Sequence, residues 1–153
     1  MIAEALRGVL QAAPGITDKL GTWEFSSGVP KPAIFTSRII PEGCDYPAVL
    51  ITEVGGMPWG TRGSKGSDTS FQIVVWDNKD EDESLVRDLA WAIWTLFTRR
   101  DLTPQLEPYG YVGIRCLLDA PVFHTDEHGF PGYLLTGRVI VLEASAPEGG
   151  EGS

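Results

Sequence analysis

The chain has 153 residues, the length of one domain that buries a single core without disulfide or metal staples. Its apolar fraction of 42% and charged fraction of 22% are ordinary for a globular protein, and no apolar run reaches the length of a membrane span. The net charge of -9 argues against a protein that binds nucleic acid by neutralising its phosphates.

The first half of the chain is predicted to contain one helix and two strands. Apolar residues recur at helical spacing over residues 2–13, and a Pro-Gly pair ends this run. Residues 16–32 are rich in glycine and proline and are expected to form an irregular arm. A short strand near residues 33–38 and a second strand over residues 47–54 follow, separated by a turn.

The middle of the chain is predicted to form a hairpin and a second helix. Residues 55–67 are Gly-rich and lack apolar periodicity, so we expect a long, mobile hairpin loop. The next strand, over residues 71–76, is apolar on both faces, which indicates a central position in a sheet. A helix is predicted over residues 84–99, with acidic residues before it and arginines at its end, as the helix dipole favours.

The last third is predicted to form a pair of strands over residues 112–123 and 133–144, joined by a Gly- and Pro-containing turn. Residues 145–153 are acidic and rich in glycine and serine, and we expect them to be disordered. Residues 1–144 then form a single domain of the α+β class. Its predicted architecture is a mainly antiparallel sheet of about five strands with two helices packed on it.

The Gly-rich segment 55–67 does not have the pattern of a phosphate-binding loop. Such a loop needs a lysine directly after the last glycine, followed by a hydroxyl residue and a helix. Here Lys65 precedes a glycine, and a strand follows. We therefore predict no nucleotide or other cofactor at this segment.

Other candidate sites for chemistry are also incomplete. His124 and His128 have the four-residue spacing of a zinc motif, but they lie in a predicted strand end and turn without a third ligand. Cys44 and Cys116 have neither the spacing of a redox pair nor an activating partner, and a reduced pair is expected. The acidic run at residues 77–83 lacks the calcium-loop pattern. The sequence therefore predicts no catalytic residue and no metal ligand.

Candidate partner contacts lie in the Gly-rich segment. Trp59, Arg62 and Lys65 would supply an aromatic anchor and two cations to a partner. A flexible, solvated loop is the alternative interpretation of the same residues, and the sequence alone does not choose between the two.

The second helix carries two further candidates. At 100° per residue its apolar side chains fall on one arc, whereas Trp91 and Trp94 fall outside it on the polar side. Two tryptophans on a solvated face are typical of an interface. The alternative is that the arm of residues 16–32, which carries the candidate contact Trp23, folds over them.

The order of the elements and several loose patterns carry a resemblance to a known family. These patterns are the segments IFTSRIIPEGCDYPAVLITEV (residues 34–54) and FQIVVWDN (residues 71–78), and the closing strand at residues 132–142. With them, the chain resembles the tail-completion (tail-terminator) proteins of long-tailed bacteriophages and gene-transfer particles over most of its length.

The resemblance implies a structural protein without enzymatic activity. It implies a homo-oligomeric ring of six subunits that caps the tail tube and joins the tail to the head connector. The implied partners are the major tail tube protein and the head-completion protein, with DNA only passing through the lumen. The implied location is the tail-neck region of the particle, after assembly in the cytoplasm of a bacterial host. The resemblance also favours partner contact as the role of the Gly-rich segment.

Two other classes of function stay open at this point. A neck or head-closure adaptor ring would share the structural role but would contact the portal side. A small ligand-binding domain or an enzyme is the other class, and the lack of converging titratable residues in the sequence counts against it.

Overall fold

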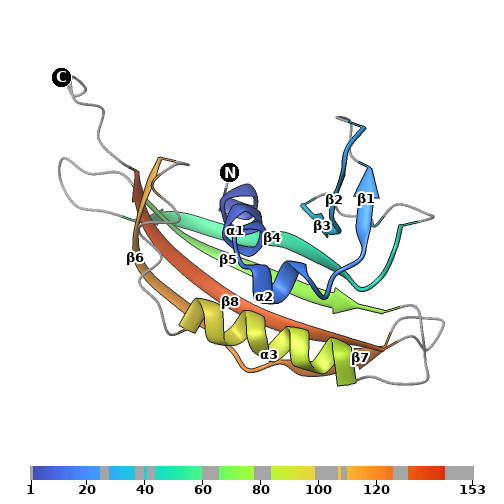
Figure 1. Cartoon of the computed structure of the whole chain (residues 1–153). Coiled ribbons are helices and arrows are strands. Elements are labelled where there is room, and N and C mark those ends of the chain that lie inside the picture. The colour runs from blue at the N-terminus through green and yellow to red at the C-terminus, as the bar shows by residue number, and fades with distance from the viewer. Residues whose placement is uncertain are drawn as a thin grey trace.

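The computed structural model describes residues 2–24, 28–36, 40, 44–59, 66–77, 84–98, 107, 110–125 and 131–143. Within them the chain forms three helices, one six-stranded sheet and one separate two-stranded hairpin (Figure 1). This confirms the α+β class. The described chain has one helix and several short strands more than the sequence predicts.

The large sheet is antiparallel except at one edge, where β3 and β4 run parallel. The strand predicted to be central, β5, is flanked by β4 and β8, which confirms that prediction. In spatial order the strands are β3 (Ile34–Phe35), β4 (Ala48–Trp59), β5 (Gly66–Trp76), β8 (Pro131–Glu143) and β6 (Tyr111–Leu118), while β7 (Val122–Thr125) also pairs with β8.

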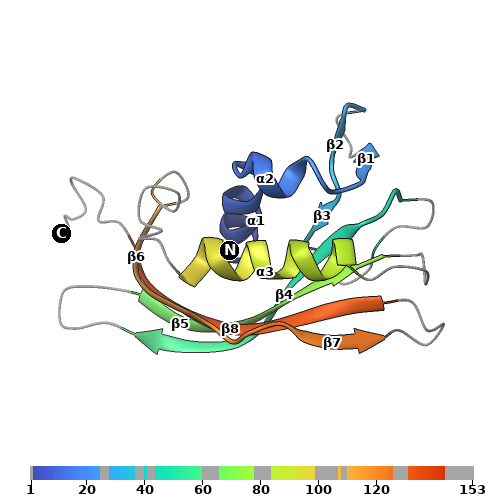
Figure 2. The ribbon, with the colours of Figure 1, turned by 60° about the horizontal axis from the view of Figure 1, so that its bottom comes forward.

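All three helices lie on the same face of this sheet (Figure 2). Helix α1 (Ile2–Gln11) packs on β3 and β4, the short helix α2 (Pro14–Thr17) follows it, and α3 (Ser84–Thr98) packs on β5, β6 and β8. The apolar arc predicted for the second helix points at the sheet, except that Leu85 remains 38% exposed. The core between the layers includes the fully buried side chains Leu6, Leu10, Ile51, Phe71, Ile73, Leu89, Ile93, Phe97 and Leu135.

The arm predicted to be irregular contains regular structure. It begins inside α2 and then forms a hairpin of β1 (Thr22–Glu24) and β2 (Pro30–Pro32). Backbone pairing fixes its root, because the N–H of Gly21 donates to the carbonyl of Pro47 at 2.8 Å. A Cβ at Gly21 would lie 2.3 Å from the Asp45 backbone, so only glycine allows this approach.

The prediction of a loop over residues 55–67 is wrong at both of its ends. Residues 55–59 continue β4, and residues 66–67 begin β5, with Trp59 opposite Gly66. A bulge between Glu53 and Gly55 shifts the register but does not end the ladder. Backbone N–H and C=O groups make the ladder, so a segment without apolar alternation can still join it. Residues 60–65 lie outside the described part of the chain.

The strand predicted over residues 112–123 is interrupted. β6 ends at Leu118, and β7 begins at Val122 on the same edge of β8. Pro121 lies in the gap, where it has no N–H to give to a ladder. The proposed tail at residues 145–153 lies outside the described residues.

Candidate interaction surfaces

One face of the large sheet carries no helix of the described chain, and Figure 2 shows this face on the side away from α1, α2 and α3. Side chains alternate along each strand, so Phe71, Ile73 and Val75 of β5 point to the helices, while their neighbours point to the opposite side. We call the opposite side the open sheet face.

The open sheet face exposes large apolar side chains. Met57 of β4 is 62% exposed, Leu117 of β6 is 44% exposed, and Val122 of β7 is 61% exposed. Val54, 60% exposed at the β4 bulge, lines a shallow hollow on this face together with Met57. These four residues come from three strands, so only the folded sheet places them on one face.

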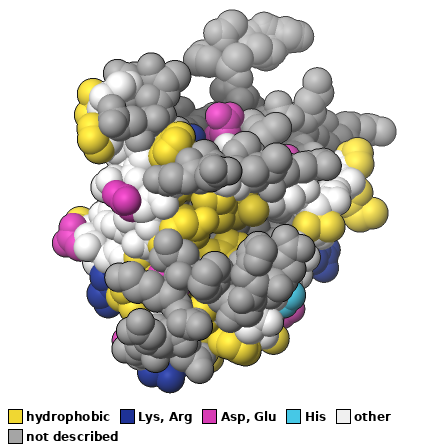
Figure 3. Space-filling view, turned by 90° about the vertical axis from the view of Figure 1, so that its right-hand side faces the viewer, with side chains coloured by type: hydrophobic (Ala, Val, Ile, Leu, Met, Phe, Trp, Pro, Cys, Tyr) yellow, Lys and Arg dark blue, Asp and Glu magenta, His cyan; other side chains and the backbone are white. Residues whose placement is uncertain are grey.

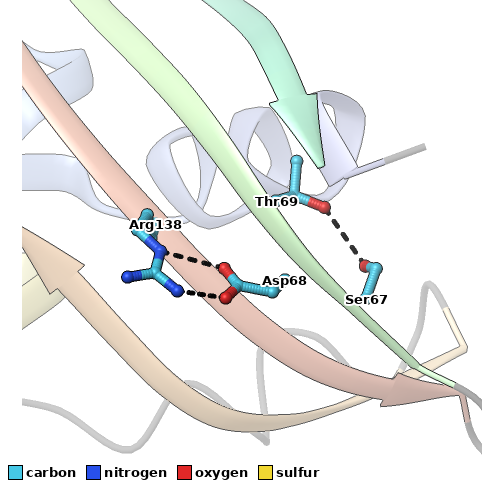
Figure 4. A network of polar contacts seen from close by, with 4 residues as sticks. All are labelled: Ser67, Asp68, Thr69 and Arg138. Carbon is cyan, nitrogen blue, oxygen red and sulfur yellow. Dashed lines mark hydrogen bonds and ion pairs between the residues drawn. The ribbon is translucent and has the colours of Figure 1, made fainter. Parts of the chain in front are cut away.

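An ion pair lies in the same hollow (Figure 4). The guanidinium of Arg138 on β8 donates two hydrogen bonds to the carboxylate of Asp68 on β5, one of them from Nε to Oδ1 at 3.1 Å. The Asp68 side chain is only 8% exposed, whereas that of Arg138 is 54% exposed. The hydrogen bonds from Arg138 lower the pKa of Asp68 below its ordinary value, and those bonds raise the pKa of Arg138.

Aromatic rings cover another part of the open sheet face. Gly132 on β8 lies in register between Trp76 of β5 and His124 of β7. A Cβ at Gly132 would lie 2.4 Å from Cε3 of Trp76, so the indole ring rests on the glycine backbone. The rings of Trp76 and His124 have centroids 5.6 Å apart. His124 thus lies against an indole, and His128 lies outside the described residues.

A second surface feature is an open groove of about 660 Å³ on the helix side of the molecule. Its walls are the start of α2 and the middle of α3, and Asp88 is the charged residue that lines it. Trp91 also lines the groove and is 42% exposed. The groove therefore presents an aromatic surface beside a single carboxylate.

The two tryptophans of α3 do not share one environment. Their rings form a T-shaped pair with centroids 5.5 Å apart. Trp94 is half-buried against the core, and its Nε1–H donates to the carbonyl of Leu118 at 3.0 Å. The end of β6 thus covers part of Trp94, whereas Ile16 of the arm lines the groove beside Trp91.

Of the remaining predicted contact residues, the structure describes the side chain of Trp23 alone. Trp23 is half-buried against a small cluster of Ala33, Phe35, Cys44 and Ala48 beside the hairpin. Trp59 ends β4, but its side chain lies outside the described part of the structure. Arg62 and Lys65 lie outside the described residues. The exposed positions Met57, Leu117 and Val122 are absent from the sequence-based candidates, because alternation within a strand does not reveal which face lacks helices.

The described thiols are free; Cys44 is buried and its thiol donates to the carbonyl of Asp45 at 3.1 Å, whereas Cys116 is half-buried. Burial, and then the charge of Asp45, raises the pKa of Cys44 to about 11, and burial raises the pKa of Cys116 to about 12. Among the described residues, no three His, Cys, Asp or Glu side chains gather closely enough to hold a metal ion. None of the described helices has the length and apolar character needed to cross a membrane.

No family model and no curated protein matches this chain.

Proposed function

We propose that this protein is a structural subunit that forms a ring at the end of a tail tube and joins the tail to the head connector of a phage or gene-transfer particle. The observation that carries the proposal is the open sheet face, which exposes Val54, Met57, Leu117 and Val122 by 44% to 62%. The sequence resemblance supplies the kind of assembly, and the exposed face supplies a physical reason for assembly.

The size of the driving force can be gauged from these four side chains. Complete burial of one such side chain contributes roughly 1.5–3 kcal/mol, so burial of the exposed half of four would contribute about 4 kcal/mol per subunit. These side chains lie on one face of the sheet and give a partner apolar area to bury. The Asp68–Arg138 pair in the hollow beside Val54 and Met57 adds polar groups that restrict which partner surface fits.

The proposed contacts follow from this role. Self-contacts close the ring, one rim meets the major tail tube protein, and the other rim meets the head-completion protein. A net charge of -9 gives a ring that does not bind the passing DNA by its phosphates. The mechanism is geometric: the ring ends tube growth and presents a new surface to the connector.

The test is the size of the purified protein with and without tail tubes from the same particle, measured by light scattering and electron microscopy. Wild-type protein should form rings alone or at tube ends. Val122→Asp and Leu117→Asp should abolish this assembly while keeping the circular dichroism of the wild type. Leu85→Asp is the matched control, because Leu85 is 38% exposed but belongs to α3.

Two results would count against the proposal. A monomer that never joins tubes would refute the ring role, and Asp variants that assemble like the wild type would refute the role of the open sheet face. Binding to isolated head connectors, without any affinity for tubes, would indicate that the protein is a neck or head-closure adaptor.

A further inference from the structure

We propose that the β1–β2 hairpin of one copy of this chain inserts into the groove between α2 and α3 of the next copy. The inference rests on the proposed ring, and it adds the hairpin and the groove to the open sheet face as surfaces that join neighbouring subunits. It is built from the shape of the groove, the exposed residues of the hairpin, and the charges that the two carry.

The groove has the composition of a receptor for a small apolar side chain with a cation beside it. Ala13, Pro14 and Ile16 line one wall, and Trp91, Ala92 and Leu96 line the other. Asp88 also lines it, and its side chain is 62% exposed. Among the described residues this carboxylate has an ion pair with the Nε of Arg87, the preceding residue of the helix, at 3.9 Å. Such a long, exposed pair contributes little, which leaves the carboxylate available to a second cation.

The hairpin carries the complementary groups. Val29, at the start of β2, is 57% exposed, and Lys31 within β2 is also exposed. Figure 3 views the end of the molecule that carries β1 and β2 and shows hydrophobic side chains at the margins of this end as well as at its middle. Val29 would supply the apolar side chain that packs in the aromatic groove, and Lys31, two residues later, would supply the cation that pairs with the carboxylate of Asp88.

The hairpin is held in place before any partner arrives. The N–H of Ala33 donates to the carbonyl of Gly21 at 2.9 Å, and the hydroxyl of Thr22 donates to Oδ2 of Asp45 at 3.3 Å. A preformed hairpin loses little conformational freedom on binding. The same anchors prevent it from reaching the groove of its own chain, since both ribbon views separate the hairpin from α3 (Figures 1 and 2).

The occupant of the groove is therefore a second copy. Hairpin and groove are different surfaces of one chain, so their contact is heterologous, and repetition of a heterologous contact gives a closed ring when the rotation closes. Two chains of net charge -9 repel each other at long range, so a contact that pairs Lys31 with Asp88 places opposite charges where the subunits meet.

The experiment uses charge reversal in the full-length chain. Lys31→Asp and Asp88→Lys should each weaken self-association at least about tenfold, because each places like charges across the contact. The double variant carrying both changes should regain assembly. An equal mixture of the two single variants should also assemble, because each hairpin then meets a groove of opposite charge in an alternating ring.

A cross-linking measurement reads the contact without tail tubes. A mixture of Val29→Cys and Thr95→Cys chains should form a mixed disulfide dimer under mild oxidation, since Thr95 lines the groove. Val29→Cys mixed with Leu85→Cys is the matched control, because Leu85 is an exposed residue of the same helix that does not line the groove. Of the native cysteines, Cys44 is buried, and the half-buried Cys116 is replaced by Ser in all chains.

The outcomes separate the two proposals. If wild-type rings form and both single charge reversals assemble equally well, the hairpin contact is wrong while the ring role stands. If the Val29–Thr95 cross-link forms but the protein never joins tubes, the contact stands and the tail role is wrong. If neither cross-link nor assembly occurs, both are overturned.

Discussion

The contrast between Trp91 and Trp94 gives the sharpest test of the structure. Both lie on α3 with ring centroids 5.5 Å apart, and the indole of Trp94 donates a hydrogen bond from Nε1 to the carbonyl of Leu118, whereas the indole of Trp91 lines the open groove. Phenylalanine keeps most of the ring area and removes the indole N–H. We therefore expect Trp94→Phe to destabilise the fold and Trp91→Phe to leave it nearly unchanged.

The size of the expected loss depends on whether the carbonyl of Leu118 has another partner, which the ladder between β6 and β8 shows. The N–H of Asp119 donates to the carbonyl of Thr136 at 2.9 Å, so the adjacent pair of Leu118 and Gly137 is a non-hydrogen-bonded pair. The carbonyl of Leu118 thus points to the outer edge of the sheet, where the indole of Trp94 meets it. Loss of one hydrogen bond to a half-buried carbonyl costs about 1–2 kcal/mol.

The assay is urea denaturation of both variants and the wild type, followed by far-UV circular dichroism. Trp94→Phe should lower the free energy of unfolding by about 1–2 kcal/mol, which corresponds to a melting temperature lower by roughly 2–8 °C. Trp91→Phe should change it by less than about 0.5 kcal/mol, as exposed substitutions do. Equal losses in the two variants, or no loss in Trp94→Phe, would show that the indole N–H does not hold β6 to the helix.

Three further predictions follow from packing and protonation. Gly137→Ala should lower the unfolding free energy by about 1–3 kcal/mol in urea titrations, since its Cβ would lie 2.6 Å from the carbonyl oxygen of Leu117, whereas Gly55→Ala, with nothing within 4 Å, should cost less than about 1 kcal/mol. The pKa of Asp68, measured by NMR, should lie below its ordinary value of 3.8, and Arg138→Gln should raise it. The ion pair therefore stabilises the fold fully above pH 3.8, and this stabilisation is lost as the pH falls through the lowered pKa. At pH 8 the raised pKa of Cys44 keeps its thiol protonated, so buried Cys44 should resist iodoacetamide in the native protein, and rapid labelling of Cys44 would contradict its buried placement.

Local patterns in the sequence predicted the elements whose side chains meet the core. The helix over residues 84–99 corresponds to α3, because its apolar arc repeats at the helical period and packs on one sheet. The strand over residues 71–76 was predicted to be central from its apolar residues on both faces, and β5 is central. The Gly-rich residues 55–59 gave no such signal, because backbone pairing with β5 alone makes them a strand.

The sequence by itself determined the α+β class, the position of α1 and α3, and the central strand. In each of these elements the buried side chains repeat at the period of a helix or a strand, and this repeat can be read from residues close together in the sequence. Only the tertiary structure decided which sheet face the three described helices cover and that the carbonyl of Leu118 meets the indole of Trp94. It also decided that Asp68 meets Arg138, 70 residues away. These contacts join residues far apart in sequence, and the helix or strand repeat of one segment does not indicate which distant residue it will contact.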